Sequence, residues 1–357
     1  MSRFLSSKYK SLEPYTPGEQ PKDRVLVKLN TNESPYPPIP EIAEAVREAA
    51  ECLQLYSDPD CTELRQAIAD MAGVSPDKVI CNNGSDETLY FAFLAYCDES
   101  CPAVFPDISY GFYPVFAEMT GVEYKAIPLK EDLRIAAEDY YDAGGTIFIA
   151  NPNAPTGIPL SLSEIEDILV HNRDNVVVID EAYVDFGTDT AIPLIEKYDN
   201  LLVVQTFSKS RSLAGARLGY GIGSGEIIAD LNALRYSTNP YNVDRLAMAA
   251  GCASLARDEI NRGNCKAVME TRAYTVGRLK EMGFEMTDST ANFIFIRHPD
   301  ISGGELFTSL RKRGVIIRHF TKERISDYNR VTIGSREQME IFLRESQDIL
   351  ESFGGNK

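Results

Sequence analysis

Six short apolar segments alternate with helical patterns along the middle of the chain, and this alternation constrains the fold more than any other feature. Short segments that are apolar at nearly every position are typical of strands covered on both faces of a sheet. Strands that alternate with helices form βαβ units around a mostly parallel sheet. The segments cover residues 101–105, 122–127, 146–150, 176–180, 201–207 and 218–223. The sequence therefore predicts an α/β fold.

The regions outside this alternation predict two further parts of the molecule. Residues 1–40 are rich in Pro, Ser and Tyr and predict an extended arm. Beyond the alternation, a connecting helical pattern, three strands and a final helix are predicted at 244–282, 292–297, 315–318, 331–333 and 337–352. A chain of 357 residues is long enough for two lobes. We expect an arm at 1–40 that joins the small lobe, a large domain at 41–270 and a small domain at 271–357.

Composition argues against several classes of partner. The formal net charge of −17 disfavours nucleic acid and anionic membrane surfaces, so an anionic ligand must be attracted by local arginines. No apolar segment is long enough to cross a membrane. The seven cysteines lack metal-type spacing and the three histidines are scattered, so neither a metal site nor a Ser/His hydrolase is expected. An odd number of cysteines without a signal peptide indicates reduced thiols in a cytoplasm.

The strongest chemical signal follows the apolar run at 201–204. Two hydroxyls, a lysine and, eight positions after the lysine, an arginine occur there as Thr206, Ser208, Lys209 and Arg217. A lysine at a strand end can form a Schiff base with an aldehyde, while the hydroxyls and the arginine can bind an anionic group of the same ligand. A Ser-Lys pair after a strand is also common in solvated loops, so this segment alone leaves both interpretations open.

Two upstream strand ends carry complementary groups. The strand at 176–180 ends at Asp180, and Tyr183 follows three residues later. Open α/β sheets bind ligands at the carboxyl ends of their strands. An aspartate there can keep a pyridinium nitrogen protonated, which makes the ring an electron sink, and Tyr183 can hydrogen-bond a phenolic oxygen of that ring. The strand at 146–150 runs into a rigid Asn-Pro-Asn-Ala-Pro-Thr-Gly turn. Together these strand ends predict one ligand site.

In this order, the motifs resemble those of fold-type I pyridoxal 5'-phosphate (PLP) aminotransferases, and the chain is most similar to the histidinol-phosphate aminotransferase family. The resemblance extends from about residue 29 to the end, through matches at 29–36, 55–59, 64–65, 84–87, 314–318 and 330–334. It implies the fold of PLP-dependent transferases of type I, with a large domain around a mostly parallel seven-stranded sheet and a smaller α/β domain. It also implies a homodimer.

The resemblance implies a role for each matching residue around the cofactor. Lys209 would hold PLP as a Schiff base, Asp180 would protonate the ring nitrogen, and Tyr183 would contact the phenolic oxygen. The residues expected at the phosphate are Ser85, Asp86, Thr206, Ser208 and Arg217, the first two through backbone amides at a helix start. An ordinary helix cap is the alternative for that helix start.

Three aromatic and amide positions carry further expectations. Tyr110 is expected to stack on the cofactor ring, with Phe112 or Tyr113 as alternatives. Tyr56 would reach the phosphate in the neighbouring subunit; a solvent-facing turn is the alternative. The family usually has Asn immediately before Pro-Thr-Gly, where the amide bonds the phenolic oxygen, but this chain has Ala154. Either Asn153 takes over this contact, or Tyr183 is the only partner.

The expected substrates are a small-molecule amino donor and a 2-oxo acid. Arg330 would bind the carboxylate of glutamate or 2-oxoglutarate, and Arg318 the phosphate of the donor. Asn32 and Tyr36 are also expected to contact substrate, whereas surface ion pairs are the alternative for the arginines.

The implied reaction is ping-pong transfer from L-histidinol phosphate to 2-oxoglutarate, giving imidazole acetol phosphate and L-glutamate in histidine biosynthesis. Alternatives are a PLP decarboxylase acting on threonine phosphate and an aminotransferase for aromatic amino acids. A PLP-binding domain of a transcription regulator is disfavoured, because the chain is acidic and no helix-turn-helix module precedes the arm.

Overall fold

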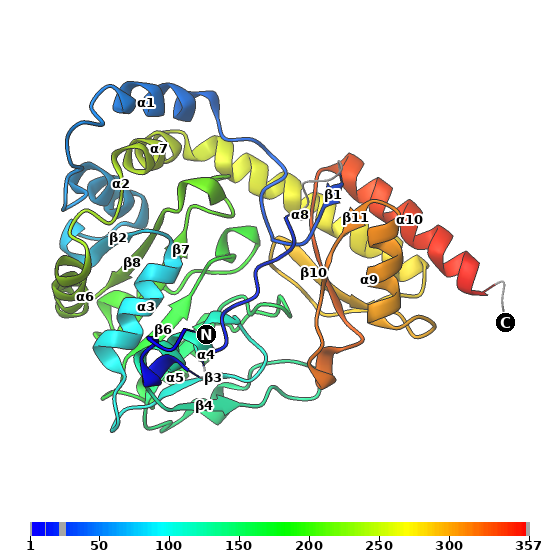
Figure 1. Ribbon diagram of the computed structural model, residues 1–357, viewed down its shortest axis with the longest axis horizontal. Coiled ribbons are helices and arrows are strands. Elements are labelled where there is room, and N and C mark those ends of the chain that lie inside the picture. Colours follow the sequence, from blue (N-terminus) through cyan, green and yellow to red (C-terminus); the bar gives the residue numbers. More distant parts are fainter. Residues whose placement is uncertain (1, 11, 21–25, 355–357) are drawn as a thin grey trace.

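A seven-stranded sheet forms the centre of the larger part of the molecule, in the order β2-β8-β7-β6-β5-β3-β4 (Figure 1). We analysed a computed structural model that describes residues 2–10, 12–20 and 26–354. Strand β8 is antiparallel to both of its neighbours, and the other pairs are parallel. The strands are β2 (Val79–Asn82), β3 (Ala103–Pro106), β4 (Tyr124–Ile127), β5 (Thr146–Ala150), β6 (Val177–Asp180), β7 (Leu201–Thr206) and β8 (Gly219–Gly223). The predicted α/β fold with a mostly parallel seven-stranded sheet is confirmed.

Helices cover both faces of this sheet because the central strands are apolar in both directions. Alternate side chains of a strand point to opposite faces. In β6, Val178 packs with one group of helices, whereas Val177 and Ile179 pack with another. The first group comprises α3 (Ser85–Tyr96), α4 (Phe112–Thr120) and α6 (Gly225–Thr238). The second group comprises α2 (Thr62–Ala72), α5 (Leu162–Val170) and α7 (Arg245–Ala256), and α1 (Pro40–Ala50) packs outside α7.

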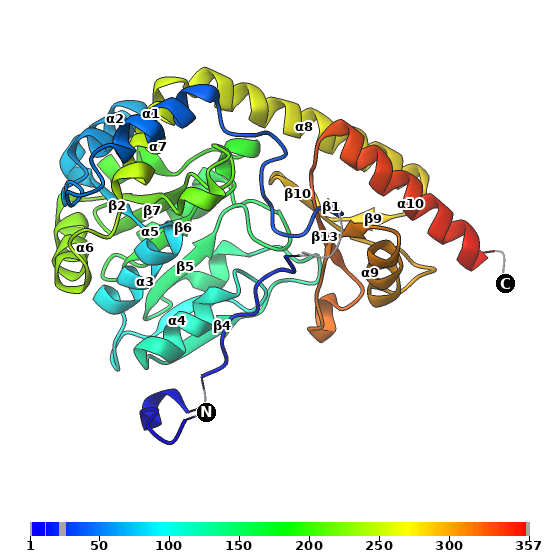
Figure 2. The same cartoon turned by 45° about the horizontal axis from the view of Figure 1, so that its top comes forward.

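A smaller four-stranded sheet, in the order β12-β13-β10-β9, lies beside the large one (Figure 2). Its strands are β9 (Glu285–Met286), β10 (Phe293–Arg297), β12 (Arg318–His319) and β13 (Asn329–Thr332). It is accompanied by α9 (Gly303–Lys312) and α10 (Arg336–Gly354). In the arm, β1 (Val27–Lys28) pairs in parallel with β11 (Val315–Ile316), which ties the arm to this smaller part.

The connecting helical pattern at 244–282 forms two helices instead of one. Helix α7 ends before Arg257, whose backbone leaves the helical conformation, and α8 (Asp258–Glu281) then runs from the large sheet to the small one (Figure 1). The predicted division at residue 270 falls inside α8. The predicted arm and small domain include residues 1, 11, 21–25 and 355–357, which lie outside the described residues.

None of the helices among the described residues combines the length and the apolar character needed to cross a lipid bilayer.

Candidate active site

A cavity of about 180 Å³ opens where β6 and β7 end, beside the start of α3 and the arm. The motifs predicted to form one ligand site converge here, because parallel strands bring their carboxyl ends to the same edge of a sheet. The predicted cofactor residues that line it are Ser85, Asp86, Tyr110, Asp180, Tyr183, Thr206, Ser208, Lys209 and Arg217. Of the residues predicted to contact the cofactor, Asn153 and Tyr56 do not line this cavity.

Lys209 lines this cavity and lies three residues after the end of β7. Its Nζ donates a hydrogen bond to the carbonyl oxygen of Thr31 at 3.3 Å and lies 5.9 Å from the centre of the Tyr183 ring. Burial, and after it the positive charge of Arg330, lowers the pKa of Lys209 to about 8. A sizeable fraction of the amine is therefore neutral near pH 7, as a nucleophile or a proton acceptor requires.

Asp180 ends β6 and is only 5% exposed. The hydroxyl of Tyr113 donates to its Oδ2 at 3.2 Å, and the amide of Ala182 donates to its Oδ1 at 3.3 Å. Burial, and after it the negative charge of Asp86, raises the pKa of Asp180 to about 7. A cation beside this carboxylate would favour its ionised form, so the position suits the protonated nitrogen of a pyridine ring.

The opposite end of the cavity is built to hold an anion. Helix α3 begins at Ser85, where its first amides have no partner within the helix. Arg217 reaches the same place: its Nη1 donates to the Ser208 hydroxyl at 3.3 Å and its Nη2 lies 3.3 Å from the Asp86 carboxylate. A Cβ on Gly219 would lie 2.3 Å from the Ser85 nitrogen, so β8 approaches the helix start only because this residue is glycine. These groups fit the phosphate of PLP.

Aromatic side chains close one side of the cavity. Tyr110 lines it, and its hydroxyl donates to Asp86 at 2.6 Å. The two alternatives for ring stacking lie elsewhere: Phe112 stacks on Tyr15 of the arm, and Tyr113 is fully buried in the core. Tyr113 instead holds Asp180, a contact that the sequence analysis did not identify. A tyrosine one helical turn after a predicted stacking residue is a weak signal for such a role.

Asn153 does not reach the cavity. Its amide nitrogen donates to the Ile108 carbonyl at 3.0 Å and to the Thr156 hydroxyl at 3.2 Å, and its oxygen accepts from Ser109 at 2.8 Å. These bonds hold the turn in place and leave the amide no free group. Ala154, the next residue, lines the cavity without a polar atom in its side chain.

A second cavity of about 350 Å³ adjoins the first and shares Thr31, Tyr110, Ala154, Tyr183 and Lys209 with it. Its wall contains the predicted substrate residues Asn32, Arg318 and Arg330. The Arg330 Nη2 donates to the Asn30 carbonyl at 3.0 Å, and the Nε makes no hydrogen bond to any described residue. The Arg318 Nη2 donates to the Thr16 carbonyl at 3.2 Å. Tyr36 lines neither cavity.

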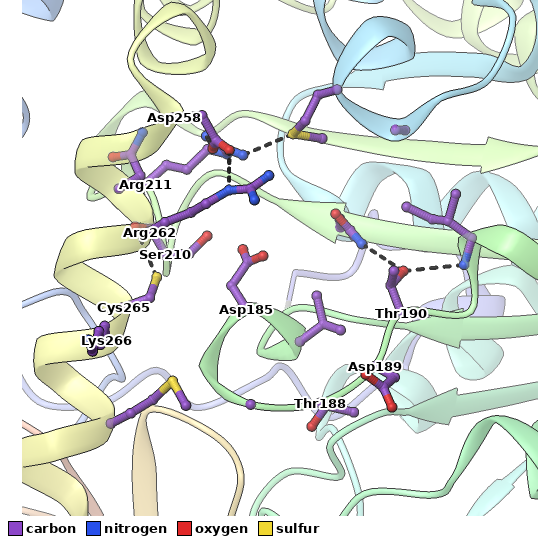
Figure 3. Close-up of a pocket in the computed structure, with 18 of the residues that line it drawn as sticks. Asp185, Thr188, Asp189, Thr190, Ser210, Arg211, Asp258, Arg262, Cys265 and Lys266 are labelled. Atoms are coloured by element: carbon purple, nitrogen blue, oxygen red, sulfur yellow. Dashed lines mark hydrogen bonds and ion pairs between the residues drawn. The ribbon is translucent and has the colours of Figure 1, made fainter.

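A third cavity, of about 600 Å³ and larger than the two adjoining ones, lies between α8 and the loop at 184–193 (Figure 3). None of the predicted site residues lines it. Its buried arginine, Arg211, is neutralised by Asp258 at 2.8 Å, and Arg262 pairs with the same carboxylate. Cavity size alone therefore does not locate the chemistry of this protein.

Tyr56 lies on the surface and lines neither of the two adjoining cavities of its own chain. It is 79% exposed and stacks on Tyr241 with ring centres 4.5 Å apart. Leu53 and Leu55 beside it are 56% and 59% exposed. Exposed apolar side chains gathered in this way are typical of a protein–protein contact.

Comparisons with known proteins identify the family of this chain. A family model described as aminotransferase class I and II matches residues 24–345. A histidinol-phosphate aminotransferase of Acinetobacter baylyi is 49% identical over 340 residues, covering 94% of each chain. One of Brachyspira hyodysenteriae is 45% identical over 354 residues, covering 99% of this chain and 100% of that protein. The crystal structure of histidinol-phosphate aminotransferase from Sinorhizobium meliloti in complex with pyridoxal-5'-phosphate has the same fold, with a TM-score of 0.88 at 22% identity over 99% of each chain. The chain therefore belongs to the class I and II aminotransferases and, within them, to the histidinol-phosphate aminotransferase family.

Proposed function

We propose that this protein transfers the amino group of L-histidinol phosphate to 2-oxoglutarate, giving imidazole acetol phosphate and L-glutamate. The observation that carries this proposal is the pair of adjoining cavities that share Lys209. The first cavity is lined by groups that can bind an anion and by a buried aspartate, and the second is lined by two arginines. PLP fits the first cavity, and a substrate with two anionic groups fits the second. The relatives of this chain are named for amino transfer from histidinol phosphate.

Each predicted cofactor residue of the first cavity has a proposed task. Lys209 would hold the cofactor through its aldehyde; once the substrate amine has displaced it, the free amine would take a proton from the substrate Cα, which its lowered pKa favours. Asp180 holds the proton on the ring nitrogen, while Tyr110 covers the ring and Tyr183 binds the phenolic oxygen. The phosphate is held by the Ser85 and Asp86 amides, the Thr206 and Ser208 hydroxyls, and Arg217. When bound, PLP supplies the electron sink for negative charge that develops at the substrate Cα.

The arginines of the second cavity have proposed roles in substrate binding. Arg330 is partly buried, and its Nε has no hydrogen-bond partner among the described residues, so it can bind a carboxylate. Arg318 lies nearer the surface and is held by the arm, where it can bind the phosphate of the donor. Local arginines are needed here because the overall field of the protein repels anions.

We also propose that the protein is a homodimer whose contact includes the exposed patch around Tyr56. Leu53, Leu55, Tyr56 and Tyr241 are the exposed apolar side chains that support this proposal. In the dimer, Tyr56 would reach the phosphate in the neighbouring subunit. A cytoplasmic location is proposed on the basis of seven free cysteines. The arm at 1–40, large domain at 41–270 and small domain at 271–357 remain our proposed division.

The test mixes the PLP-loaded protein with L-histidinol phosphate and follows both the absorbance spectrum and the organic products. We expect conversion of the cofactor to its pyridoxamine form without release of carbon dioxide, and return of the original spectrum on adding 2-oxoglutarate. Release of carbon dioxide from threonine phosphate, with no response to L-histidinol phosphate, would instead assign a decarboxylase. A response to aromatic amino acids alone would assign the other alternative.

A further inference from the structure

Asn32 lies in the arm, is 1% exposed and connects two parts of the molecule that are far apart in sequence. Its backbone has φ of 57°, in the left-handed region that asparagine tolerates better than most residues. Its backbone amide donates to the Thr332 hydroxyl at 2.9 Å, and its side chain bonds both Thr332 and Tyr183. This side chain therefore joins strand β13 to the wall of the cofactor cavity.

The hydrogen bonds of this group run in one direction. The Thr332 hydroxyl accepts from the Asn32 backbone amide and donates to the Asn32 Oδ1 at 3.0 Å, so the oxygen of the side-chain amide faces Thr332. The Asn32 Nδ2 consequently faces Tyr183 and donates to its hydroxyl oxygen at 3.0 Å. Burial raises the pKa of Tyr183, so the hydroxyl keeps its proton. Because Asn32 occupies one lone pair, that proton must be donated elsewhere.

The cavity is the place where this proton can be donated. Tyr183 lines both adjoining cavities, and its hydroxyl donates to no residue in the described part of the chain. Ala154 and Asn153 present no polar side-chain atom to the cofactor cavity, as described above. Tyr183 is therefore the side chain on this wall that is available to a phenolic oxygen.

We propose that Asn32 is a positioning residue, set by Thr332, that orients the Tyr183 hydroxyl as a hydrogen-bond donor to the phenolic oxygen of the cofactor. This inference deepens the proposed function and rests on PLP being bound in this cavity. Arg330 lies two residues before Thr332, on the same face of β13. The strand that carries the substrate arginine therefore also sets the donor to the cofactor.

The test measures the pH midpoint of the absorbance of the lysine-bound cofactor in a set of variants. A donor at the phenolic oxygen stabilises negative charge there and lowers the pKa of the chromophore, so its loss raises the midpoint. Tyr183→Phe should raise it by about one to two pH units. Asn32→Gly, which keeps the left-handed backbone without strain, should raise it by a smaller amount. The double variant should match Tyr183→Phe alone, since Asn32 acts only through that hydroxyl.

A second pair of variants tests the role of Thr332. Thr332→Val removes the hydroxyl without changing the shape of the side chain and should raise the pH midpoint. Thr332→Ser keeps the hydroxyl and should leave the midpoint at the value of the unaltered protein. The matched control is Asn292→Ala, which removes a bond of 2.9 Å to the backbone carbonyl of Asn32 and leaves the directed side chains intact. It should lower thermal stability and leave the midpoint unchanged.

Three outcomes separate this inference from the proposed function. Unchanged midpoints in both Asn32→Gly and Thr332→Val, with a raised midpoint in Tyr183→Phe, would overturn the role of Asn32 while leaving the cofactor site intact. Additive shifts in the double variant would also overturn it, because they would show that Asn32 acts independently of Tyr183. Absence of cofactor absorbance in the unaltered protein would reject PLP binding itself.

Discussion

Asp180 and Glu181 are neighbours at the end of β6, and both are buried carboxylates whose pKa is raised to about 7, mainly by burial. Their surroundings differ. Asp180 lines the cofactor cavity and accepts two hydrogen bonds longer than 3.0 Å. Glu181 accepts from the Thr190 hydroxyl and the Ala191 amide at 2.6 Å and from the Gln205 amide at 2.7 Å.

These two residues show that a raised pKa does not by itself mark a catalytic group. Glu181 satisfies its oxygens with protein donors and ties β6 to the loop beside the cavity of about 600 Å³, where Thr190 is seen (Figure 3). Asp180 keeps one side open to a ligand. The position of the open side, and not the size of the shift, separates a proposed site residue from a structural one.

The largest effect should come from Lys209→Ala, because Lys209 lines the same cavity as Asp180. The variant removes the amine that we propose binds the cofactor and moves the proton, so kcat should fall by about 10³-fold or more. The visible absorbance of the lysine-bound cofactor should disappear, as a spectrum of the PLP-treated protein would show. A coloured and active variant would contradict the assignment of this site.

The variants Asp180→Asn and Glu181→Gln compare the two neighbouring carboxylates directly. Asp180→Asn removes the charge that we propose holds the proton on the ring nitrogen, so kcat should fall by about 10²–10³-fold. Glu181→Gln should change kcat only a few-fold, because Glu181 makes no contact with the cavity. Steady-state kinetics of both purified variants check this. Equal losses would mean that the shared burial of the two carboxylates, and not the cavity, decides their importance.

Arg318 and Arg262 extend the comparison to two arginines that line different cavities, Arg318 the proposed substrate cavity and Arg262 the cavity of about 600 Å³. Arg318→Ala should raise the KM for L-histidinol phosphate by about 10–100-fold, because a charge-assisted hydrogen bond to the phosphate contributes about 1.5–3 kcal/mol. The KM for glutamate should change much less. Arg262→Ala is the matched control and should leave both constants unchanged, since the Arg262 side chain is 76% exposed beside the cavity of about 600 Å³. Equal changes for both substrates in Arg318→Ala would indicate a structural role.

The large sheet and the groups at its strand ends were predictable because their signals are local. Strands β6 and β7 are short apolar segments with a site residue at or near their ends: Asp180 is the last residue of β6, and Lys209 lies three residues after β7. Parallel strands then bring these ends together without any further information. For this reason the predicted strands at 146–150, 176–180 and 201–207 agree with the structure to within a residue.

The arm and the small sheet were harder to predict, because their contacts join residues far apart in sequence. Asn32 forms hydrogen bonds with Tyr183 and Thr332, and no sequence pattern near Asn32 predicts either partner. The fate of Asn153 likewise depends on three hydrogen bonds, two of them to the distant turn at Ile108 and Ser109. The break between α7 and α8 was not predicted either, because Arg257, where it occurs, is a residue type that favours helices.

The smallest effect is expected on the free energy of unfolding, and it tests the structural role of Glu181. The pKa of Glu181 rises from 4.5 to about 7 on folding, so the folded protein binds this proton more tightly than the unfolded chain does. Its contribution to stability is therefore fully present below pH 4.5 and is lost as the pH rises through 7. The loss is on the order of 3 kcal/mol.

Glu181→Gln cannot ionise and should remove this part of the pH dependence. It should also lose one of the three hydrogen bonds, since an amide nitrogen cannot accept, which lowers stability by about 1 kcal/mol at acidic pH. The difference from the unaltered protein should then shrink or reverse as the pH increases. Urea unfolding at several pH values, with the exposed Glu131→Gln as a control for a general charge effect, measures the two slopes. Parallel slopes would show that Glu181 ionises equally in the folded and unfolded states.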